Sequence, residues 1–346
     1  MAPRSTRTVV LTGASGVVGR AVAKELTDEY VIGLVHNDHD VPEVDEVLTS
    51  DLARPRMGLS EERWQALARQ ADVIVHSGAL TTWGQPAERY REINIDGTRR
   101  VIELARSAEA PIHLISTAFV RAIERGLVDQ LTPGNVVKPY IRSKFQAEQL
   151  LATSGIPHTI FRPTNLIGDS STGESSRPQI VQMMSDWICR GKAPFFPAHP
   201  GNLVDIVPLD VLSRAVAGAV RSGENGHLYW VTYGERAMSV EDALEILAEH
   251  AQSLGRDIAR GPVVDPREQL PVELDEIPAT SRAFVAVMID VSEITHACGG
   301  VLPTSLNELR DHFAVAIPGD ADAYRASLRY WAKERERGEQ YAKATS

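Results

Sequence analysis

The 346-residue chain is poor in cysteine and has no long apolar run, and each shortage excludes a class of protein. Its two cysteines, Cys189 and Cys298, stand at no metal-binding or redox spacing, so we expect two buried thiols in a reducing compartment and no metal site. No apolar stretch is long enough to cross a bilayer, and the first eight residues lack a secretory signal. These absences favour a cytoplasmic protein.

Positive charge is also in short supply. The 36 Lys and Arg residues stand against 46 Asp and Glu, which gives a formal net charge of −10. Such a balance disfavours nonspecific binding to nucleic acid or to an anionic membrane. The hydrophobic fraction of 43% and the length are those of a globular protein with a large core and room for a smaller lobe. A cytoplasmic enzyme is the expectation.

Short β-branched runs alternate with helical patterns through the first half of the chain. Strands are expected at 8–12, 31–35, 44–50, 73–77, 112–116 and 158–161, and helices at 17–26, 61–70, 87–107 and 143–153. Crossovers of this length predict right-handed βαβ units. The expected fold class is therefore α/β, with a doubly wound parallel sheet of the Rossmann type.

The alternation of strand and helix patterns becomes irregular after residue 163. Residues 168–178 are rich in Gly, Ser and Thr and predict a loop, whereas 203–208 and 210–221 predict a further strand and helix. A helix at 239–251 begins at Ser239 with Asp242 three residues on. We expect residues 1–168 to form the nucleotide-binding core, with contributions from about 203–235. Residues 169–202 and 236–346 would form a smaller C-terminal substrate-binding lobe.

A glycine-rich turn joins the first strand to the first helix. In a dinucleotide site Gly13 would permit the tight turn, Gly16 would let the backbone approach the pyrophosphate, and Gly19 would let helix pack on strand. The N–H groups and dipole at the helix N-terminus would favour the phosphates. A glycine triplet alone is weak evidence, but the strand–turn–helix context favours a cofactor site. The residues expected to face the cofactor here are Gly13, Ser15, Gly16, Val17, Val18, Gly19 and Arg20.

The end of the second strand indicates which nicotinamide cofactor binds. An acidic residue there would hold the adenosine ribose hydroxyls and repel a 2′-phosphate. This chain has His36 and Asn37, with no carboxylate before Asp38, and Arg20 offers a cation. The pattern favours NADP, with NAD as the alternative. His36 is either a cofactor contact or a surface histidine in a loop.

A Tyr–x–x–x–Lys pair places Tyr140 and Lys144 one helical turn apart on the same face. A tyrosine titrates too high to exchange protons at neutral pH, but an adjacent ammonium and a cationic nicotinamide favour its phenolate. Thr117, at the end of a strand, would offer its hydroxyl to the same substrate oxygen. The alternative for Thr117 is a strand-end hydroxyl that caps backbone. The pattern predicts a catalytic triad of Thr117, Tyr140 and Lys144.

These motifs resemble the extended short-chain dehydrogenase/reductases, and four more segments extend the resemblance. It implies that Asp51 and Leu52 contact the adenine, and that His76-Ser77-Gly78-Ala79 passes the ribose and phosphates. Asn94-Ile95-Asp96-Gly97-Thr98 is similar to the family's Asn–x–x–Gly–Thr helix motif. Arg162-Pro163 is similar to its Arg–Pro turn, whose following backbone meets the nicotinamide amide. The implied cofactor residues are Asp51, Leu52, Ser77, Gly78, Ala79, Asn94, Tyr140, Lys144, Pro163, Thr164, Asn165 and Leu166.

Within that superfamily the chain resembles the thioester reductase branch, which includes terminal reductase domains of nonribosomal peptide synthetases and of carboxylic acid reductases. The resemblance covers roughly residues 8–235. It is carried by Gly58-Leu59-Ser60, Trp64, Leu67-Ala68, Lys144–Glu148 and Gly168–Gly173. Departures lie at His36, where the family often has Arg, at Ser77-Gly78, and at Asn165, where a Gly often follows the Arg–Pro pair.

The resemblance implies reduction of a carrier- or CoA-bound acyl thioester to an aldehyde or alcohol. Because the chain begins at its first strand, we expect the thioester to arrive in trans. A ketone or aldehyde reductase or a hydroxy-dehydrogenase is the alternative; a nucleotide-sugar epimerase and a non-catalytic NAD(P) sensor are lesser ones. The oligomeric state stays open.

Four aromatic or proline residues and two histidines have less specific interpretations. Phe195, Phe196, Pro197 and Trp187 either line the substrate pocket or belong to the core. We expect His199 and His227 to be structural or exposed, since no metal-ligand partner accompanies either.

Overall fold

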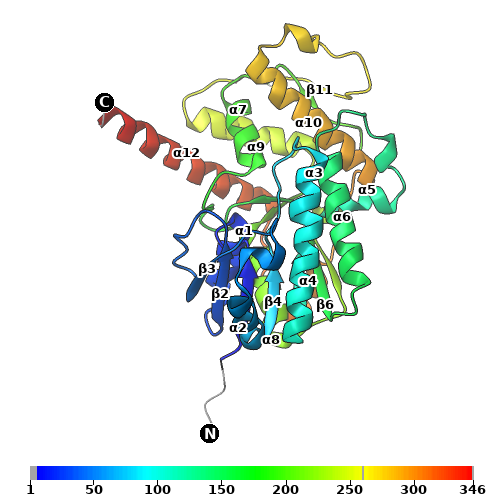
Figure 1. Ribbon diagram of the computed structural model, residues 1–346. Helices are drawn as coiled ribbons and strands as arrows, with labels where there is room; N and C mark the ends of the chain where they lie inside the picture. The colour runs from blue at the N-terminus through cyan, green and yellow to red at the C-terminus, as the bar shows by residue number, and fades with distance from the viewer. Residues whose placement is uncertain (1–5, 259–260, 345–346) are drawn as a thin grey trace.

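A seven-stranded parallel sheet forms the centre of the protein (Figure 1). The computed structural model describes residues 6–258 and 261–344. The strand order is β10-β6-β5-β4-β1-β2-β3, and all neighbouring strands are parallel. The strands are β1 (Thr8–Thr12), β2 (Tyr30–Val35), β3 (Glu46–Thr49), β4 (Val73–His76), β5 (Ile112–Ile115), β6 (His158–Pro163) and β10 (Leu228–Val231). The doubly wound parallel sheet expected from the sequence is confirmed.

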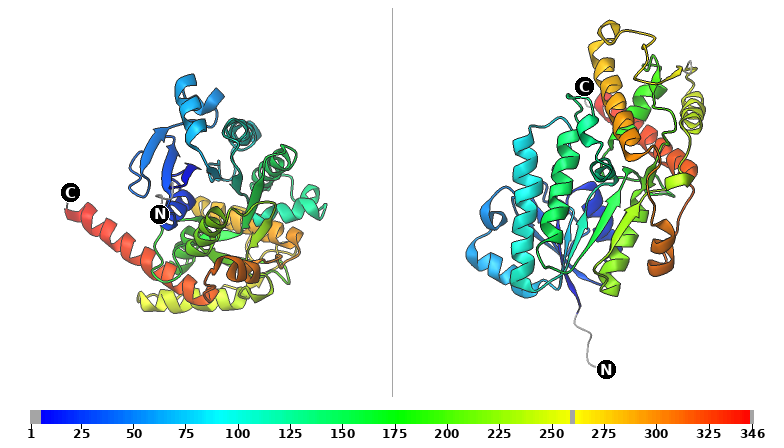
Figure 2. Two further views of the ribbon diagram at one scale, coloured as in Figure 1. Left: turned by 90° about the horizontal axis from the view of Figure 1, so that it is seen from below. Right: turned by 90° about the vertical axis from the view of Figure 1, so that its right-hand side faces the viewer.

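Helices cover both faces of this sheet (Figures 1 and 2). On one face α1 (Val17–Glu25) packs against α8 (Leu209–Ser222), and α11 (Leu306–Phe313) packs on α8. On the other face lie α2 (Glu61–Gln70), α4 (Asp96–Ala108) and α6 (Lys138–Ala152). Two separate apolar clusters fill the two sides. Burial on both faces explains why the central strands are almost continuously apolar.

The six strands predicted in the first half are each confirmed to within two residues. Two helix predictions were wrong in detail. The helix expected from residue 143 begins at Lys138, because Pro139 is compatible with a first helical turn. The helix expected at 87–107 is divided into α3 (Ala87–Tyr90), a π-helical turn (Arg91–Ile95) and α4.

A second group of elements lies above the carboxyl edge of the sheet (Figures 1 and 2). It contains α7 (Ile180–Cys189), α9 (Val240–Ser253), α10 (Ala279–Cys298) and α12 (Asp320–Ala344), with the paired strands β8 (Phe196–Pro197) and β11 (Val263–Val264). These helices share an apolar cluster of their own. Helix α9 begins with the expected reciprocal cap between Ser239 and Asp242.

Short elements connect the two groups. Strands β7 (Asn165–Ile167) and β9 (Ile206–Pro208) pair with each other, and α5 (Arg121–Glu124) follows β5. Residues 255–315, which the sequence pattern left unassigned, contain α10 and α11. In the part of the chain that the structure describes, none of the helices is both long and apolar enough to cross a membrane.

Candidate functional site

The glycine turn after β1 lies against the loop after β4, where the strand order reverses. Gly13 has a φ of +67°, and a Cβ atom there would lie 2.7 Å from the backbone of Gly78. A Cβ atom on Gly19 would collide with the carbonyl oxygen of Gly13. Both glycines are therefore required by close backbone approach. Nucleotides bind at such a reversal point in open α/β sheets.

The N-terminus of α1 is available to an anion. Its N-cap residue is Gly16, which offers no side-chain cap, and the first turn contains no acidic residue. Ser15, Val17 and Val18 are half-buried around it. The first N–H groups of a helix have no intrahelical partners, and the dipole there favours negative charge. This cradle of glycines and uncapped N–H groups fits a dinucleotide pyrophosphate.

Arg20 is engaged by carboxylates. Its guanidinium contacts Glu43 at 3.0 Å and Asp38 at 3.1 Å. His36 is exposed, with Nδ1 3.3 Å from the carbonyl oxygen of Ser50. The cation that the sequence offered for a 2′-phosphate is thus paired with two acidic side chains in this structure.

Asp51 and Leu52 follow β3 at the same edge of the sheet. Asp51 accepts a hydrogen bond from the Ala53 N–H at 2.9 Å and pairs with Arg54 at 3.2 Å, so its carboxylate closes its own turn. The Leu52 side chain lies in the space that a Cβ atom on Gly78 would occupy. Ser77 and Ala79 flank Gly78 and are half-buried.

A buried hydrogen-bond chain connects the two loops to α6, the helix that contains Tyr140 and Lys144. The Gly78 N–H donates to Thr12 Oγ1 at 3.0 Å, and Thr12 Oγ1 lies 2.7 Å from His76 Nδ1. His76 Nε2 lies 3.0 Å from Thr98 Oγ1, which donates its proton to the carbonyl oxygen of Asn94 at 2.6 Å.

The protonation states in this hydrogen-bond chain follow from counting donors. The Thr98 hydroxyl already donates its proton to the Asn94 carbonyl oxygen, so His76 must donate from Nε2 to Thr98 Oγ1. Nδ1 is then an acceptor, and Thr12 donates to it. Burial, aided by the Lys144 charge, lowers the pKa of His76 to about 3, so the ring is neutral.

Asn94 extends the hydrogen-bond chain to α6. Its Oδ1 accepts from the Leu80 N–H at 2.7 Å, and its Nδ2 donates to the Leu80 carbonyl oxygen at 3.1 Å and to Ser143 Oγ at 2.9 Å. Ser143 donates to the carbonyl oxygen of Tyr140. Asn94 lies in the π-helical turn, a feature often found at functional sites. The Asn94 side-chain amide is hydrogen-bonded to Leu80 and Ser143, which indicates that Asn94 positions the loop after β4 against α6.

Tyr140 and Lys144 lie buried on α6, facing the end of β5. The Lys144 ammonium donates to the carbonyl oxygen of Ile115, and burial lowers the pKa of Lys144 to about 8, opposed by the Glu148 carboxylate. Burial raises the pKa of the Tyr140 phenol, and interaction with the Thr117 hydroxyl partly offsets this. The unliganded site therefore holds a neutral tyrosine.

Thr117 follows β5 and caps the short helical turn Ala118–Val120. Its Oγ1 accepts from the Phe119 N–H at 3.4 Å, as the capping interpretation expected. That bond uses a lone pair and leaves the hydroxyl proton available for another acceptor. The capping and catalytic interpretations of Thr117 are therefore compatible. Ser116 Oγ, next to it, is buried and has no partner among the residues that the structure describes.

The Arg–Pro turn is anchored by a buried guanidinium. Arg162 makes a bidentate pair with Glu148 at 3.0 and 2.6 Å, reaches Glu124 at 2.6 Å, and lies over the ring of Trp230. Pro163 ends β6. Thr164 Oγ1 then donates to the carbonyl oxygen of Asp205 at 3.1 Å, and Asn165 and Leu166 begin β7.

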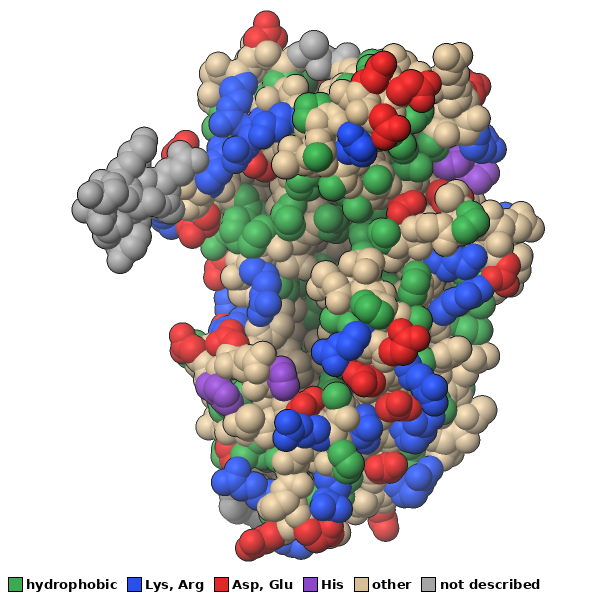
Figure 3. Space-filling view, turned by 45° about the horizontal axis from the view of Figure 1, so that its top comes forward, with side chains coloured by type: hydrophobic (Ala, Val, Ile, Leu, Met, Phe, Trp, Pro, Cys, Tyr) green, Lys and Arg blue, Asp and Glu red, His purple; other side chains and the backbone are tan. Residues whose placement is uncertain are grey.

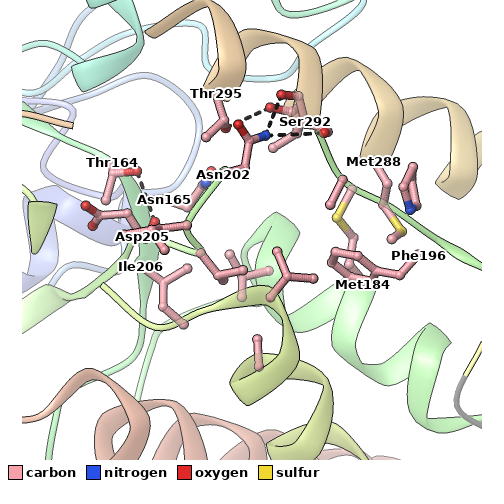
Figure 4. Close-up of a pocket in the computed structure, with 18 of the residues that line it drawn as sticks. Thr164, Asn165, Met184, Phe196, Asn202, Asp205, Ile206, Met288, Ser292 and Thr295 are labelled. Atoms are coloured by element: carbon pink, nitrogen blue, oxygen red, sulfur yellow. Dashed lines mark hydrogen bonds between the residues drawn. The ribbon is translucent and has the colours of Figure 1, made fainter. Parts of the chain in front are cut away.

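A largely apolar pocket opens beside this turn (Figures 3 and 4). Its empty volume, including the part open to solvent, is about 980 Å³. Figure 3 shows hydrophobic side chains gathered around a hollow between the helical group and the sheet. In Figure 4, Thr164 and Asn165 lie at one side of the pocket, and Met184, Met288 and Phe196 at the other. Phe119, two residues beyond Thr117, also lines it.

The expected pocket aromatics divide between pocket and core. Phe196 and Pro197 line the pocket. Phe195 is fully buried in the core, and Trp187 stacks on Phe284, so neither lines it. His227 is exposed and pairs with Glu224.

Several residues of the site were not found from the sequence. Thr12 and Ser143 stand next to motif residues in the sequence, but the sequence does not show that they bond to His76 and Asn94. The pocket residues Met184 and Met288 carry no local signal. Within the described residues, no cluster of His, Cys, Asp and Glu side chains is arranged to hold a metal ion.

The His76 chain predicts a linked loss of stability and cofactor affinity. In His76→Leu the Thr12 hydroxyl loses the acceptor of its proton and the Thr98 hydroxyl loses a donor, so we expect the unfolding free energy to fall by about 1–3 kcal/mol. NAD(P)H should also bind more weakly, because Thr12, which accepts from the Gly78 N–H, loses the bond that orients it. Thermal melting and fluorescence titration measure both. The control is His113→Leu in β5, since His113 Nδ1 is buried with no partner within the described part of the chain. Unchanged NAD(P)H affinity in His76→Leu would refute the inference that His76 supports the Gly78 loop.

Comparisons with known proteins identify the family of the chain. The male sterility protein family, a family of NAD-binding domains, matches residues 36–216, which is just over half of the chain. The chain is 30% identical over 250 residues to a linear gramicidin synthase of Brevibacillus parabrevis, covering 62% of this chain and 5% of that protein. It is 28% identical over 242 residues to the hybrid PKS-NRPS synthetase gkaA of Penicillium citrinum, covering 64% and 6%.

Solved structures share the fold. The terminal R domain from the myxalamid PKS-NRPS pathway has a TM-score of 0.73 at 23% identity and covers 96% of this chain and 92% of that one. UDP-glucuronic acid 4-epimerase from Bacillus cereus, in complex with NAD, has a TM-score of 0.63 at 15% identity and covers 94% and 99%. The chain spans about 5 to 7% of the length of the synthetases that it matches. The chain belongs to the male sterility protein family, in the thioester reductase branch of the extended short-chain dehydrogenase/reductases, and is an NAD(P)-dependent oxidoreductase of that type.

Proposed function

We propose that the protein reduces an acyl thioester, bound to coenzyme A or to a carrier, to an aldehyde or alcohol with NADPH. The observation that carries the proposal is the link between the proposed triad and the apolar pocket. Phe119, which lines that pocket, lies in the turn that Thr117 caps, and Tyr140 shares an apolar cluster with Phe119 and with Leu302, another residue that lines the pocket. An acyl chain in the pocket and its carbonyl group at Thr117 are therefore compatible with one bound substrate.

Thr117 and Tyr140 would hold the thioester oxygen. Both hydroxyls donate to the negative charge that develops as the carbonyl carbon becomes tetrahedral, in a site from which water is excluded. The nicotinamide cofactor, when bound, supplies the hydride. Tyr140 gives its proton to the oxygen, and the Lys144 ammonium stabilises the phenolate that remains. The resulting hemithioacetal releases the thiol and leaves the aldehyde.

The cofactor would lie along the edge of the sheet. The uncapped N-terminus of α1 and the Gly13–Gly78 contact suit its pyrophosphate, and Lys144 would hold the nicotinamide ribose. Pro163 to Leu166 would meet the nicotinamide amide. We retain NADP as the preferred cofactor because no carboxylate ends β2. Binding would require the Arg20 side chain to exchange Asp38 or Glu43 for the 2′-phosphate.

Removing the Tyr140 hydroxyl tests the reaction directly. We expect Tyr140→Phe to lower kcat/KM for acyl-CoA and acyl-pantetheine thioesters roughly 10²- to 10⁴-fold, since a general acid contributes about that much. NADPH oxidation and product chromatography measure turnover and the number of electrons transferred. Tyr233→Phe is the matched control, because the Tyr233 hydroxyl donates to the Pro318 carbonyl oxygen and is not part of the proposed triad. Turnover of ketones and aldehydes but of no thioester would refute the proposal.

The Lys144 ammonium predicts a basic limb in the pH profile. Burial lowers its pKa, so the charged form dominates below about pH 8 and is lost as pH rises through that value. We expect kcat/KM to fall above about pH 8 and the limb to move upward in Lys144→Arg, because a guanidinium keeps its proton. The exposed Lys24→Arg should leave the limb in place. An unmoved limb in Lys144→Arg would mean that another group titrates.

A further inference from the structure

An arginine from a distant part of the chain lies against the glycine turn. Arg177 stands in the loop between β7 and α7, and its guanidinium donates to the carbonyl oxygen of Ser15 at 2.9 Å. Ser15 belongs to the turn between β1 and α1. The Nε–H of Arg20, on α1, donates to the same carbonyl oxygen at 3.4 Å. Two guanidinium groups therefore meet beside the proposed cofactor cradle.

The two arginines differ in their partners. Arg20 is paired with Asp38 and Glu43. Arg177 donates to a neutral carbonyl oxygen, and within the described part of the chain no carboxylate forms an ion pair with it. Its side chain is exposed, and the bond to Ser15 uses one of the five N–H donors of the guanidinium. An anion can therefore reach Arg177 without breaking an ion pair.

The position of Arg177 corresponds to the adenosine end of a dinucleotide. Ser15 directly precedes Gly16, the N-cap of α1, where the pyrophosphate fits. Asp38 lies just beyond the end of β2, where this fold recognises the adenosine ribose. The pKa of Asp38 is held below its ordinary value chiefly because Arg20 donates to it, and the charge of Arg177 adds to this effect. Arg177 is therefore close both to the pyrophosphate cradle and to the ribose end of the site.

The backbone of Arg177 is held by its own segment. Its carbonyl oxygen accepts from Ser175 Oγ at 2.7 Å and from Gln179 Nε2 at 3.2 Å. The same loop packs closely on α12, since a Cβ atom on Gly173 would lie 2.2 Å from the carbonyl oxygen of Ala326. A fixed backbone keeps the guanidinium within reach of the glycine turn, so binding a ligand orders only a side chain.

A 2′-phosphate is the part of the cofactor that suits this cation. Phosphate oxygens accept from the planar, forked donors of a guanidinium, often two at a time. The 2′-hydroxyl of NAD carries no charge and gains little from a cation. Arg20 must release a carboxylate before it can bind the phosphate, whereas Arg177 need not.

We propose that Arg177 is a specificity-determining residue, which binds the 2′-phosphate of NADP. The inference rests on the proposed use of NADP and adds a residue that recognises it, from a loop outside the glycine turn and the end of β2. It does not depend on which thioester is reduced.

Isothermal titration calorimetry with NADP and with NAD tests the assignment without turnover, because the two ligands differ only in the 2′-phosphate. We expect the wild-type protein to bind NADP more tightly. Arg177→Ala should weaken NADP binding roughly tenfold, at the lower end for a hydrogen bond to a charged group because the site is open to solvent. NAD affinity should not change. Arg177→Lys, which keeps the charge but not the fork, should lose less.

Arg310→Ala is the matched control, because Arg310 is an exposed arginine on α11 that pairs with Asp311. It removes the same charge and should leave both affinities unchanged. Unchanged NADP affinity in Arg177→Ala would overturn the assignment. Equal weakening of NADP and NAD would also overturn it, since Arg177 would then support only the glycine turn. Equal affinity of the wild type for both ligands would overturn the NADP preference as well, whereas failure to turn over thioesters would bear on the proposed reaction alone.

Discussion

The close contact between the turn after β1 and the loop after β4 is the constraint on which the site depends. Gly13 and Gly78 touch backbone to backbone, which a side chain at Gly13 would prevent. The His76 hydrogen-bond chain then ties this contact to Asn94, and Asn94 ties it to the helix that carries Tyr140. The proposed cofactor cradle and the helix that carries Tyr140 are thus held by one buried polar network. Every member of such a network must be satisfied for it to stabilise a single arrangement.

The sheet could be predicted, and Tyr140 and Lys144 could be proposed as catalytic residues, because their signals are local. A strand, a glycine turn and a helix follow one another within residues 8–26, and Tyr140 and Lys144 are separated by one turn. The role of His76 could not be predicted, because its partners Thr12 and Thr98 come from distant segments that only the parallel sheet brings together. For the same reason the sequence offered Arg20 as a free cation, although Glu43 and Asp38 surround it.

Most of the pocket could not be predicted, on similar grounds. Phe196 and Pro197 were expected there, and Thr164 and Asn165 follow the Arg–Pro motif, but the walls that α7, α9 and α10 contribute contain no motif. Its apolar lining follows from ordinary helix packing, in which Met184 and Met288 face the hollow. The pocket therefore depends on tertiary contacts, whereas the residues proposed to carry out the reaction stand in local motifs.

The most direct test of the account is a crystal structure with NADP and an analogue of an acyl thioester in which a methylene group separates the carbonyl carbon from the sulfur atom, so that the carbonyl oxygen is kept and no thiol can leave. The account predicts this oxygen within about 3 Å of both Tyr140 Oη and Thr117 Oγ1, with the acyl chain in the pocket. An acyl chain bound outside the pocket, or a carbonyl oxygen beyond hydrogen-bond reach of both hydroxyls, would contradict it.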